Sequence, residues 1–354
     1  MSSGSQVVVL EAGATVPEAM PFAQACEVTG VSGLAEPEAA QAVAAALRRG
    51  GAVAVVVLGS DGLHWLDAEH ARGWIAAGEP SGFGPAWSDR LAQGHVPADA
   101  ALLAWPTLPL LSWGDAPPAP ARHVAAAQPM GLYAIVDRLD ILRRVLDAGV
   151  RTAQLRIKRP AGADAAWESG LLATLREGLA MARDLGATLF VNDHWRLAAE
   201  LDAAAVHLGQ EDLLALGDAG RAELQASGVA LGISSHAMWE LARARALSPR
   251  YIACGPVWPT TTKDMPWRPQ GLDNLAWWCR TAGVPVVAIG GILTPERVRR
   301  AARAGADGVC VLRGLGADPR VTVPALQEAF DLGRSEIEWT TPAAQPHPTL
   351  GEGA

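Results

Sequence analysis

The sequence predicts an α/β protein, built as a (β/α)8 TIM barrel over residues 130–335 with a smaller N-terminal α/β extension. Two observations support this fold class. Short apolar, β-rich runs alternate eight times with helix-compatible stretches, which is typical of a closed parallel sheet. The unusual polar residues directly follow these runs, and barrels carry their chemistry at the carboxyl ends of their strands. An open, doubly wound sheet is the alternative architecture.

The predicted strands are short and rich in Val, Ile, Leu and Ala, as expected where both faces of a sheet are buried. They lie at residues 131–136, 152–157, 188–192, 205–208, 230–234, 251–257, 285–289 and 308–312. The helix-compatible stretches between them lie at residues 138–149, 164–185, 211–226, 236–247, 271–282 and 295–304.

Changes in composition divide the chain into an extension, a Pro- and Ala-rich linker, the barrel and a flexible tail, at residues 1–115, 116–129, 130–335 and 336–354. Within the extension, the residue pattern predicts helices at 40–49 and 67–77 and a buried strand at 52–58.

The composition limits the function classes. The chain has 354 residues, a net charge of −8 and a hydrophobic content of 50%. General nucleic-acid-binding proteins are usually basic, so we expect no nucleic-acid partner. No apolar stretch reaches about 18 residues and the N-terminus lacks a secretory pattern, so we expect neither a membrane span nor export. The predicted protein is cytoplasmic and acts on small molecules, and the composition leaves open whether it forms a homo-oligomer.

Lysine is almost absent from the chain. Of 29 basic residues, only Lys158 and Lys263 are lysines. A compositional preference for Arg explains the general scarcity. A functional interpretation is that these two positions need a compact ammonium group, which the wide planar guanidinium of Arg does not provide. Both lysines lie in segments that follow predicted strands, which favours the functional interpretation.

Charged side chains follow the second, third and fourth predicted strands. Alternation along the second strand places Gln154, Arg156 and Lys158 on one face, where burial would require an anionic partner such as a polyphosphate. Asp193 and Asp212 follow the next two strands. Because Mg²⁺ typically takes one or two carboxylates together with phosphate oxygens, these aspartates predict a magnesium site. A structural ion-pair layer and helix N-caps are the alternatives.

A second anion-binding region is predicted after strands six to eight. Thr260, Thr262 and Lys263 lie in a long helix-free segment, which we expect to be a mobile cover over the site. Gly291 follows strand seven and Arg313 follows strand eight, where barrels commonly bind a phosphate group. A diphosphate with Mg²⁺ in the first region and a monophosphate in the second would fit this arrangement.

Together these motifs resemble the thiamine-phosphate synthase family. The resemblance runs from GLYAIVD at 131–137 through QLRIK, VND, HLGQED, GISSH, GPVWPTTTKD and AIGGI to AGADGVCVLRG at 304–314, nearly the whole barrel. It implies an enzyme that condenses an aminopyrimidine-methyl diphosphate with a thiazole phosphate, forming thiamine phosphate and diphosphate. It also implies that diphosphate leaves first, with help from Mg²⁺, and that the thiazole nitrogen then attacks the pyrimidine methylene.

The resemblance further implies a role for each site residue. Mg²⁺ would bind Asp193 and Asp212. Arg156, Lys158 and Lys263 would act in catalysis by neutralising the departing diphosphate. The two substrates would be bound by Gln154, Arg156, Lys158, Asn192, Ser234, Thr260, Thr262, Lys263, Gly291, Leu312 and Arg313.

Two positions depart from the family pattern. Arg313 stands where a small residue, often Ser, is expected, so this side chain either adds a phosphate contact or crowds the site. Ile157 stands where Glu is common, but alternation along the strand directs it away from the site.

Two other functions are compatible with the same barrel. Thiazole tautomerases share it and proceed by proton transfer, for which His236 could serve as the acid or base. A catalytically inactive barrel could also bind thiamine precursors. Neither function needs the two predicted metal carboxylates and both lysines, so these residues favour the synthase.

The N-terminal extension resembles a degenerate fragment of a hydroxymethylpyrimidine phosphate kinase, through AVAVVVLGSDGLHWLD and LAQGHVPADAALLAW. A working kinase of this kind needs a glycine-rich anion hole that carries a catalytic Asp or Cys. The corresponding segment, residues 80–87, contains neither. We therefore expect the extension to be non-catalytic.

Overall fold

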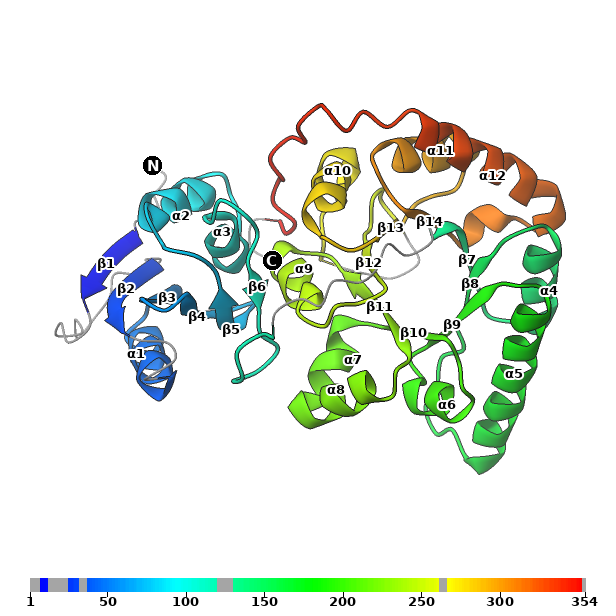
Figure 1. Cartoon of the computed structure of the whole chain (residues 1–354), viewed down its shortest axis with the longest axis horizontal. Coiled ribbons are helices and arrows are strands. Elements are labelled where there is room, and N and C mark those ends of the chain that lie inside the picture. Colours follow the sequence, from blue (N-terminus) through cyan, green and yellow to red (C-terminus); the bar gives the residue numbers. More distant parts are fainter. Residues whose placement is uncertain (1–6, 12–24, 32–36, 120–129, 261–265, 352–354) are drawn as a thin grey trace. The chain divides into compact units, whose positions relative to one another are not determined.

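The computed structural model describes residues 7–11, 25–31, 37–119, 130–260 and 266–351 (Figure 1). The chain forms two compact units. The barrel unit contains residues 123–236 and 248–346, and the N-terminal unit contains residues 1–122, 237–247 and 347–354.

Parallel strands close into a barrel, as predicted, and the doubly wound alternative is wrong. The strands follow one another around the barrel in chain order, and β14 pairs with β7 to close it. They are β7 (Gly131–Val136), β8 (Thr152–Leu155), β9 (Thr188–Asn192), β10 (Ala205–Leu208), β11 (Ala230–Ser235), β12 (Tyr251–Cys254), β13 (Val286–Ala288) and β14 (Gly308–Val311).

The barrel unit's helices are α4 (Leu139–Asp147), α5 (Ala165–Asp184), α6 (Trp195–Glu200), α7 (Gln210–Ala215), α8 (Gly217–Ala226), α10 (Gly271–Thr281), α11 (Pro295–Arg303) and α12 (Pro319–Ser335). The single helix predicted at 211–226 is two helices, because Gly217, the first residue of α8, takes a left-handed φ of 62°. Helix α6 is absent from the prediction because six residues are too few for a clear helical period.

Aromatic side chains fill the centre of the barrel. Tyr133, Phe190 and Tyr251 are each about 1% exposed, and their ring centroids lie 5.1–5.6 Å apart. They point inward from β7, β9 and β12, so each strand contributes one large side chain to the same layer. This layer forms the floor beneath the carboxyl ends of the strands, where the predicted site lies.

The N-terminal unit contains a six-stranded mixed sheet in the order β1-β2-β3-β4-β5-β6. Neighbouring strands are parallel from β1 through β3, and they are antiparallel from β3 through β6. The elements are β1 (Val7–Glu11), β2 (Ala25–Val31), α1 (Pro37–Arg49), β3 (Ala54–Gly59), β4 (Leu63–Ala68), β5 (Arg72–Ala76), α2 (Phe83–Ala92), α3 (Pro97–Leu103) and β6 (Leu110–Leu111). Helix α1 lies on one face of this sheet, and α2 and α3 lie on the other (Figure 1).

The helix predicted at 67–77 is wrong, because this segment forms the end of β4 and all of β5. Trp65 and Trp74 face each other across the two antiparallel strands, with ring centroids 4.9 Å apart. A Cβ atom at Gly73 would lie 2.6 Å from Ser112 Oγ, so Gly allows the residues after β6 to pack closely against β5. Pairing with a distant strand overrides the helical propensity of the segment.

Helix α9 (Met238–Arg245) follows β11 in the sequence but belongs to the N-terminal unit. All of its residues except Arg245 are buried. Asp99 accepts a hydrogen bond from the Trp239 amide at 2.9 Å and another from the Thr349 hydroxyl at 2.9 Å. The N-terminal unit therefore draws on three separate segments of the chain, and the predicted flexible tail contains a residue, Thr349, that is buried in it.

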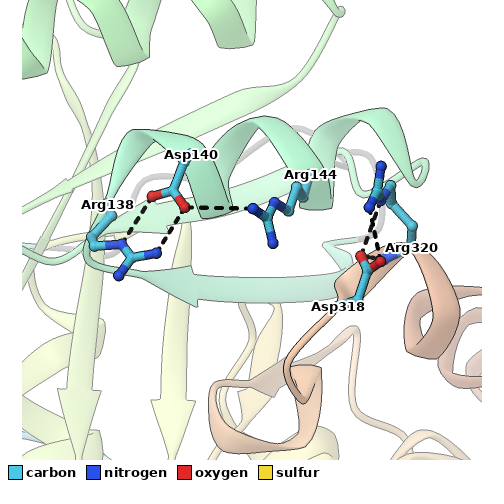
Figure 2. Close-up of polar contacts among 5 residues, drawn as sticks. All are labelled: Arg138, Asp140, Arg144, Asp318 and Arg320. Atoms are coloured by element: carbon cyan, nitrogen blue, oxygen red, sulfur yellow. Dashed lines mark hydrogen bonds and ion pairs between the residues drawn. The ribbon is translucent and has the colours of Figure 1, made fainter.

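Exposed ion pairs lie at the beginnings of α4 and α12 (Figure 2). Arg138 donates two hydrogen bonds to Asp140, at 2.9 and 2.7 Å, and Arg144 lies 3.9 Å from the same carboxylate. Arg320 pairs with Asp318 through bonds of 3.0 and 2.9 Å. Among the described residues, no helix combines the length and apolarity needed to cross a membrane.

Candidate active site

The carboxyl ends of the barrel strands surround a cavity of about 210 Å³. Every predicted site residue within the described ranges lines this cavity, namely Gln154, Arg156, Lys158, Asn192, Asp193, Asp212, Ser234, Thr260, Gly291, Leu312 and Arg313. Thr262 and Lys263 lie outside the described residues. The structure thus brings together side chains from β8 to β14 that are up to about 160 positions apart in sequence.

One side of the cavity carries the cations and carboxylates. Lys158 follows β8, and its Nζ lies 2.5 Å from Oδ2 of Asp193, which follows β9. Asp193 has a left-handed φ of 65°, a conformation that Asp tolerates better than most residues. The Lys158 side chain is 56% exposed, so its ammonium group can reach a ligand in the cavity.

The two carboxylates of this side fit a magnesium ion. Asp193 and Asp212 line the same cavity. The pKa of Asp212 is raised mainly by burial and also by the negative charge of Asp193. The described residues include no group of three or more His, Cys, Asp or Glu side chains arranged to hold a metal. Two carboxylates with open positions are the usual arrangement for Mg²⁺ that is bound together with a phosphorylated substrate.

The opposite side of the cavity is built from glycine-rich loops. Gly290 and Gly291 follow β13 with left-handed φ angles of 93° and 70°. A Cβ atom at Gly291 would lie 2.7 Å from Trp258 and 2.8 Å from the Pro259 carbonyl oxygen, so only Gly fits there. Arg313 donates a hydrogen bond to the Thr260 hydroxyl at 3.3 Å, which brings a guanidinium group to this side.

Polar side chains line the bottom of the cavity, directly above the aromatic layer. Gln154 donates to the Asn192 side-chain oxygen at 2.6 Å, and His207 contacts the Ser234 hydroxyl at 2.8 Å. Burial lowers the pKa of His207 to about 4, so this imidazole is neutral at physiological pH. Asn192 Nδ2 is buried without a hydrogen-bond partner among the described residues, which is unusual unless a ligand completes it.

Tyr133 and Tyr251 are site residues that sequence reasoning missed. They contact Gln154 and His207 from below the cavity, through their hydroxyl groups. Their hydroxyls also lie 2.9 Å from each other. One signal was available, since the chain contains only two tyrosines and both fall inside predicted strands.

The fold and the site together define a (β/α)8-barrel enzyme whose cavity has a cation–carboxylate side and a glycine-rich side. Residues 132–315 match the model of the family described as thiamine monophosphate synthase, and the chain belongs to this family.

Known proteins are similar to more than half of this chain. Thiamine-phosphate synthase from Rhizobium etli is 42% identical over 189 residues, which is 53% of this chain and 87% of that protein. The enzyme of the same name from Neisseria meningitidis is 40% identical over 206 residues, or 57% and 96% of the two chains. A solved structure of thiamine phosphate pyrophosphorylase from Pyrococcus furiosus has 27% identity and a TM-score of 0.48, covering 58% of this chain and 98% of that one.

Proposed function

We propose that the protein condenses an aminopyrimidine-methyl diphosphate with a thiazole phosphate, giving thiamine phosphate and diphosphate. One observation carries the proposal. A cation–carboxylate cluster and a glycine-rich loop meet at one cavity, in a chain of the thiamine monophosphate synthase family. Each side of the cavity is complementary to one of the two phosphorylated substrates. Both substrates are small molecules, which agrees with a cytoplasmic enzyme.

In the reaction, the bond between the pyrimidine methylene carbon and the diphosphate oxygen breaks, and the electron pair leaves with the diphosphate. The thiazole nitrogen then forms a bond to the methylene carbon with its lone pair. Arg156 and Lys158 stabilise the negative charge that develops on the departing diphosphate. No nucleophilic side chain is required, and the one thiol that lines the cavity, Cys310, stays protonated because burial raises its pKa far above the usual value.

Asp193 and Asp212 would hold Mg²⁺, which when bound neutralises charge on the diphosphate oxygens. Lys158, which pairs with Asp193 in this structure, has an exposed and flexible side chain that can turn to a substrate phosphate. On the glycine-rich side, Gly291 leaves room for a phosphate group close to the backbone, and Arg313 adds a positive charge.

The decisive experiment measures diphosphate release and thiamine phosphate formation by the purified full chain, with Mg²⁺ or with EDTA. We expect matched formation of both products that requires Mg²⁺. Proton transfer within a thiazole substrate, without any diphosphate release, would instead identify a tautomerase. Binding of both substrates without turnover would identify an inactive binding protein.

The proposed metal site is tested by Asp193→Asn, which keeps the shape of the side chain and its tolerance of left-handed backbone. We expect the Mg²⁺ concentration needed for half-maximal activity to rise roughly 10–100-fold. Asp202→Asn is the matched control, because Asp202 is exposed and also left-handed, with a φ of 50°, but does not line the cavity. An unchanged Mg²⁺ requirement in Asp193→Asn would remove this residue from the metal site.

A further inference from the structure

A continuous chain of hydrogen bonds crosses the barrel floor from one wall of the cavity to the other. Tyr133 contacts Gln154 at 3.4 Å, and the Tyr133 and Tyr251 hydroxyls lie 2.9 Å apart. Tyr251 contacts His207 Nδ1 at 2.7 Å, and His207 Nε2 contacts Ser234 at 2.8 Å. Both ends of this chain line the cavity.

The amide of Gln154 sets the direction of the chain. Its Nε2 group donates to Asn192, so its oxygen is the atom that faces Tyr133 and must accept. A tyrosine hydroxyl can donate only one hydrogen bond, and Tyr133 donates its bond to Gln154. In the contact between the two tyrosines, Tyr251 is therefore the donor and Tyr133 the acceptor. The Tyr251 hydroxyl can then only accept a hydrogen bond from His207.

His207 must therefore donate through Nδ1–H to Tyr251. His207 is 8% exposed and both of its ring nitrogens contact hydroxyl groups, so among the described residues no carboxylate bonds to the ring to support a second proton. A neutral imidazole has only one N–H group, and here that group is at Nδ1. Nε2 therefore accepts a hydrogen bond from the Ser234 hydroxyl. Ser234 consequently presents only acceptor lone pairs to the cavity.

The other end of the hydrogen-bond chain, at Asn192, offers a donor to the cavity. Asn192 accepts from Gln154 through Oδ1, and its buried Nδ2 has no partner among the described residues. The cavity therefore offers a donor at Asn192 on β9 and an acceptor at Ser234 on β11. Strand β10, which carries His207, lies between these two strands.

We propose that Tyr133, Tyr251 and His207 are positioning residues that hold Ser234 as an acceptor, so that the site selects an aminopyrimidine and rejects the corresponding oxopyrimidine. An aminopyrimidine offers a ring nitrogen to Asn192 and an amino hydrogen to Ser234. An oxo group in place of the amino group would set its lone pairs against those of Ser234, and the resulting unpaired polar groups oppose binding. This inference rests on the proposed function for the identity of the ring.

The test compares kcat/KM for the 4-amino and 4-oxo pyrimidine-methyl diphosphates in the wild type and in Tyr251→Phe. We expect the wild type to prefer the amino substrate by at least about 100-fold. Loss of the Tyr251 hydroxyl lets His207 change tautomer and Ser234 turn its hydrogen into the cavity, so the preference should fall by roughly tenfold or more. An unchanged preference in an active Tyr251→Phe variant would overturn the proposal.

Phe190→Leu is the packing control. Phe190 touches both tyrosine rings, with centroids 5.6 and 5.1 Å away, but has no polar atom. We expect this variant to keep the amino preference even if its stability falls. An equal loss of preference in Phe190→Leu would assign the effect to packing and overturn the positioning role.

Two further measurements do not depend on turnover. Nitrogen NMR of His207, identified by its loss in His207→Asn, should show a hydrogen on Nδ1 and none on Nε2, and the opposite tautomer would overturn the proposal. Calorimetry with the 4-amino and 4-oxo pyrimidine-methanols as probes should show the same preference in binding. If the wild type forms no thiamine phosphate but these two results hold, the proposed function fails and the positioning role stands.

Discussion

The buried polar groups of the N-terminal unit and of the barrel unit have different kinds of partners. In the N-terminal unit they bond mainly to the backbone. His64 accepts from the Gly59 amide at 3.1 Å, and Ser112 accepts from the Trp74 amide at 2.8 Å and donates to the Gly114 carbonyl at 2.7 Å. In the barrel floor, side chains bond to one another from Gln154 to Ser234.

This difference distinguishes polar groups that stabilise the fold from polar groups that orient the side chains of a binding site. A side chain that bonds to backbone groups, as Ser112 does, ties those parts of the backbone together. The barrel network instead ends at a cavity, and at one end the Nδ2 of Asn192 has no hydrogen-bond partner within the described part of the chain. Substitutions in the barrel site should therefore change activity more than stability, and substitutions in the N-terminal unit should do the reverse.

The largest effect is expected for Lys158→Ala, which removes a positive charge from the cation–carboxylate side. We expect kcat to fall roughly 10²–10³-fold, because this charge is stabilising mainly as diphosphate departs. The unfolding free energy should change by less than about 1 kcal/mol, since the ion pair with Asp193 is half-exposed. Steady-state kinetics and urea unfolding measure the two quantities.

Arg159→Ala is the matched control for Lys158→Ala. Arg159 is the next residue, pairs with Glu168 at 2.7 Å on the surface and does not line the cavity. Its kcat should remain within about twofold of the wild type. A comparable loss in both variants would mean that the general positive charge of this segment matters and not the position of Lys158.

The next effect concerns Asp99, whose pKa is raised to about 7 chiefly by burial. Between about pH 4 and 7 the folded protein retains a proton on Asp99 that the unfolded chain releases. This group therefore stabilises the fold most at low pH, and its contribution is lost as the pH rises through 7. Asp99→Asn can still accept from the Trp239 amide but does not titrate, so it should remove this dependence.

Urea unfolding of the wild type and of Asp99→Asn at several pH values between 4 and 8 checks this prediction. The variant should gain stability relative to the wild type by roughly 2–4 kcal/mol over this range. Other titrating groups, including His207, are common to both proteins and cancel in the difference. Parallel curves would show that Asp99 is ionised throughout.

A smaller effect is expected for Ser112→Ala in the N-terminal unit. The substitution leaves the buried Trp74 amide and Gly114 carbonyl without their partner, which costs about 1–3 kcal/mol of unfolding free energy. Ser335→Ala is the control, because Ser335 is exposed at the end of α12. Below the melting temperature kcat should be unchanged, and a lowered kcat would contradict the division between the two units.

The smallest effect is expected for the exposed pair in Figure 2, at the beginning of α12. Arg320→Ala should change the unfolding free energy by less than about 0.5 kcal/mol, because water and salt screen this pair. Asp318 still caps the helix through the Arg320 backbone amide at 3.2 Å. Thermal unfolding at low and high salt measures the change, and a loss above about 1 kcal/mol would show that surface pairs matter more in this barrel than expected.

The sequence alone predicted the barrel and many of the residues that line its cavity. Local periodicity identifies each barrel strand to within three residues, since a buried parallel strand is a short apolar run wherever it occurs. Because the strands of such a barrel all end on one side, Lys158, Asp193 and Gly291 could be expected at one site before any contact was known. The functional resemblance depends on the same local motifs.

Only the tertiary structure decided the features that depend on contacts between distant segments. The strands at 67–77 need β6 for pairing, and the place of α9 depends on Asp99, about 140 residues earlier. The direction of the hydrogen bonds from Gln154 to Ser234 follows from side chains on different strands, each of which limits the next. Sequence patterns reflect the local conformational preferences of each residue. Pairing between distant strands, and the donor and acceptor roles in a hydrogen-bond network, depend on contacts that form only when the chain folds.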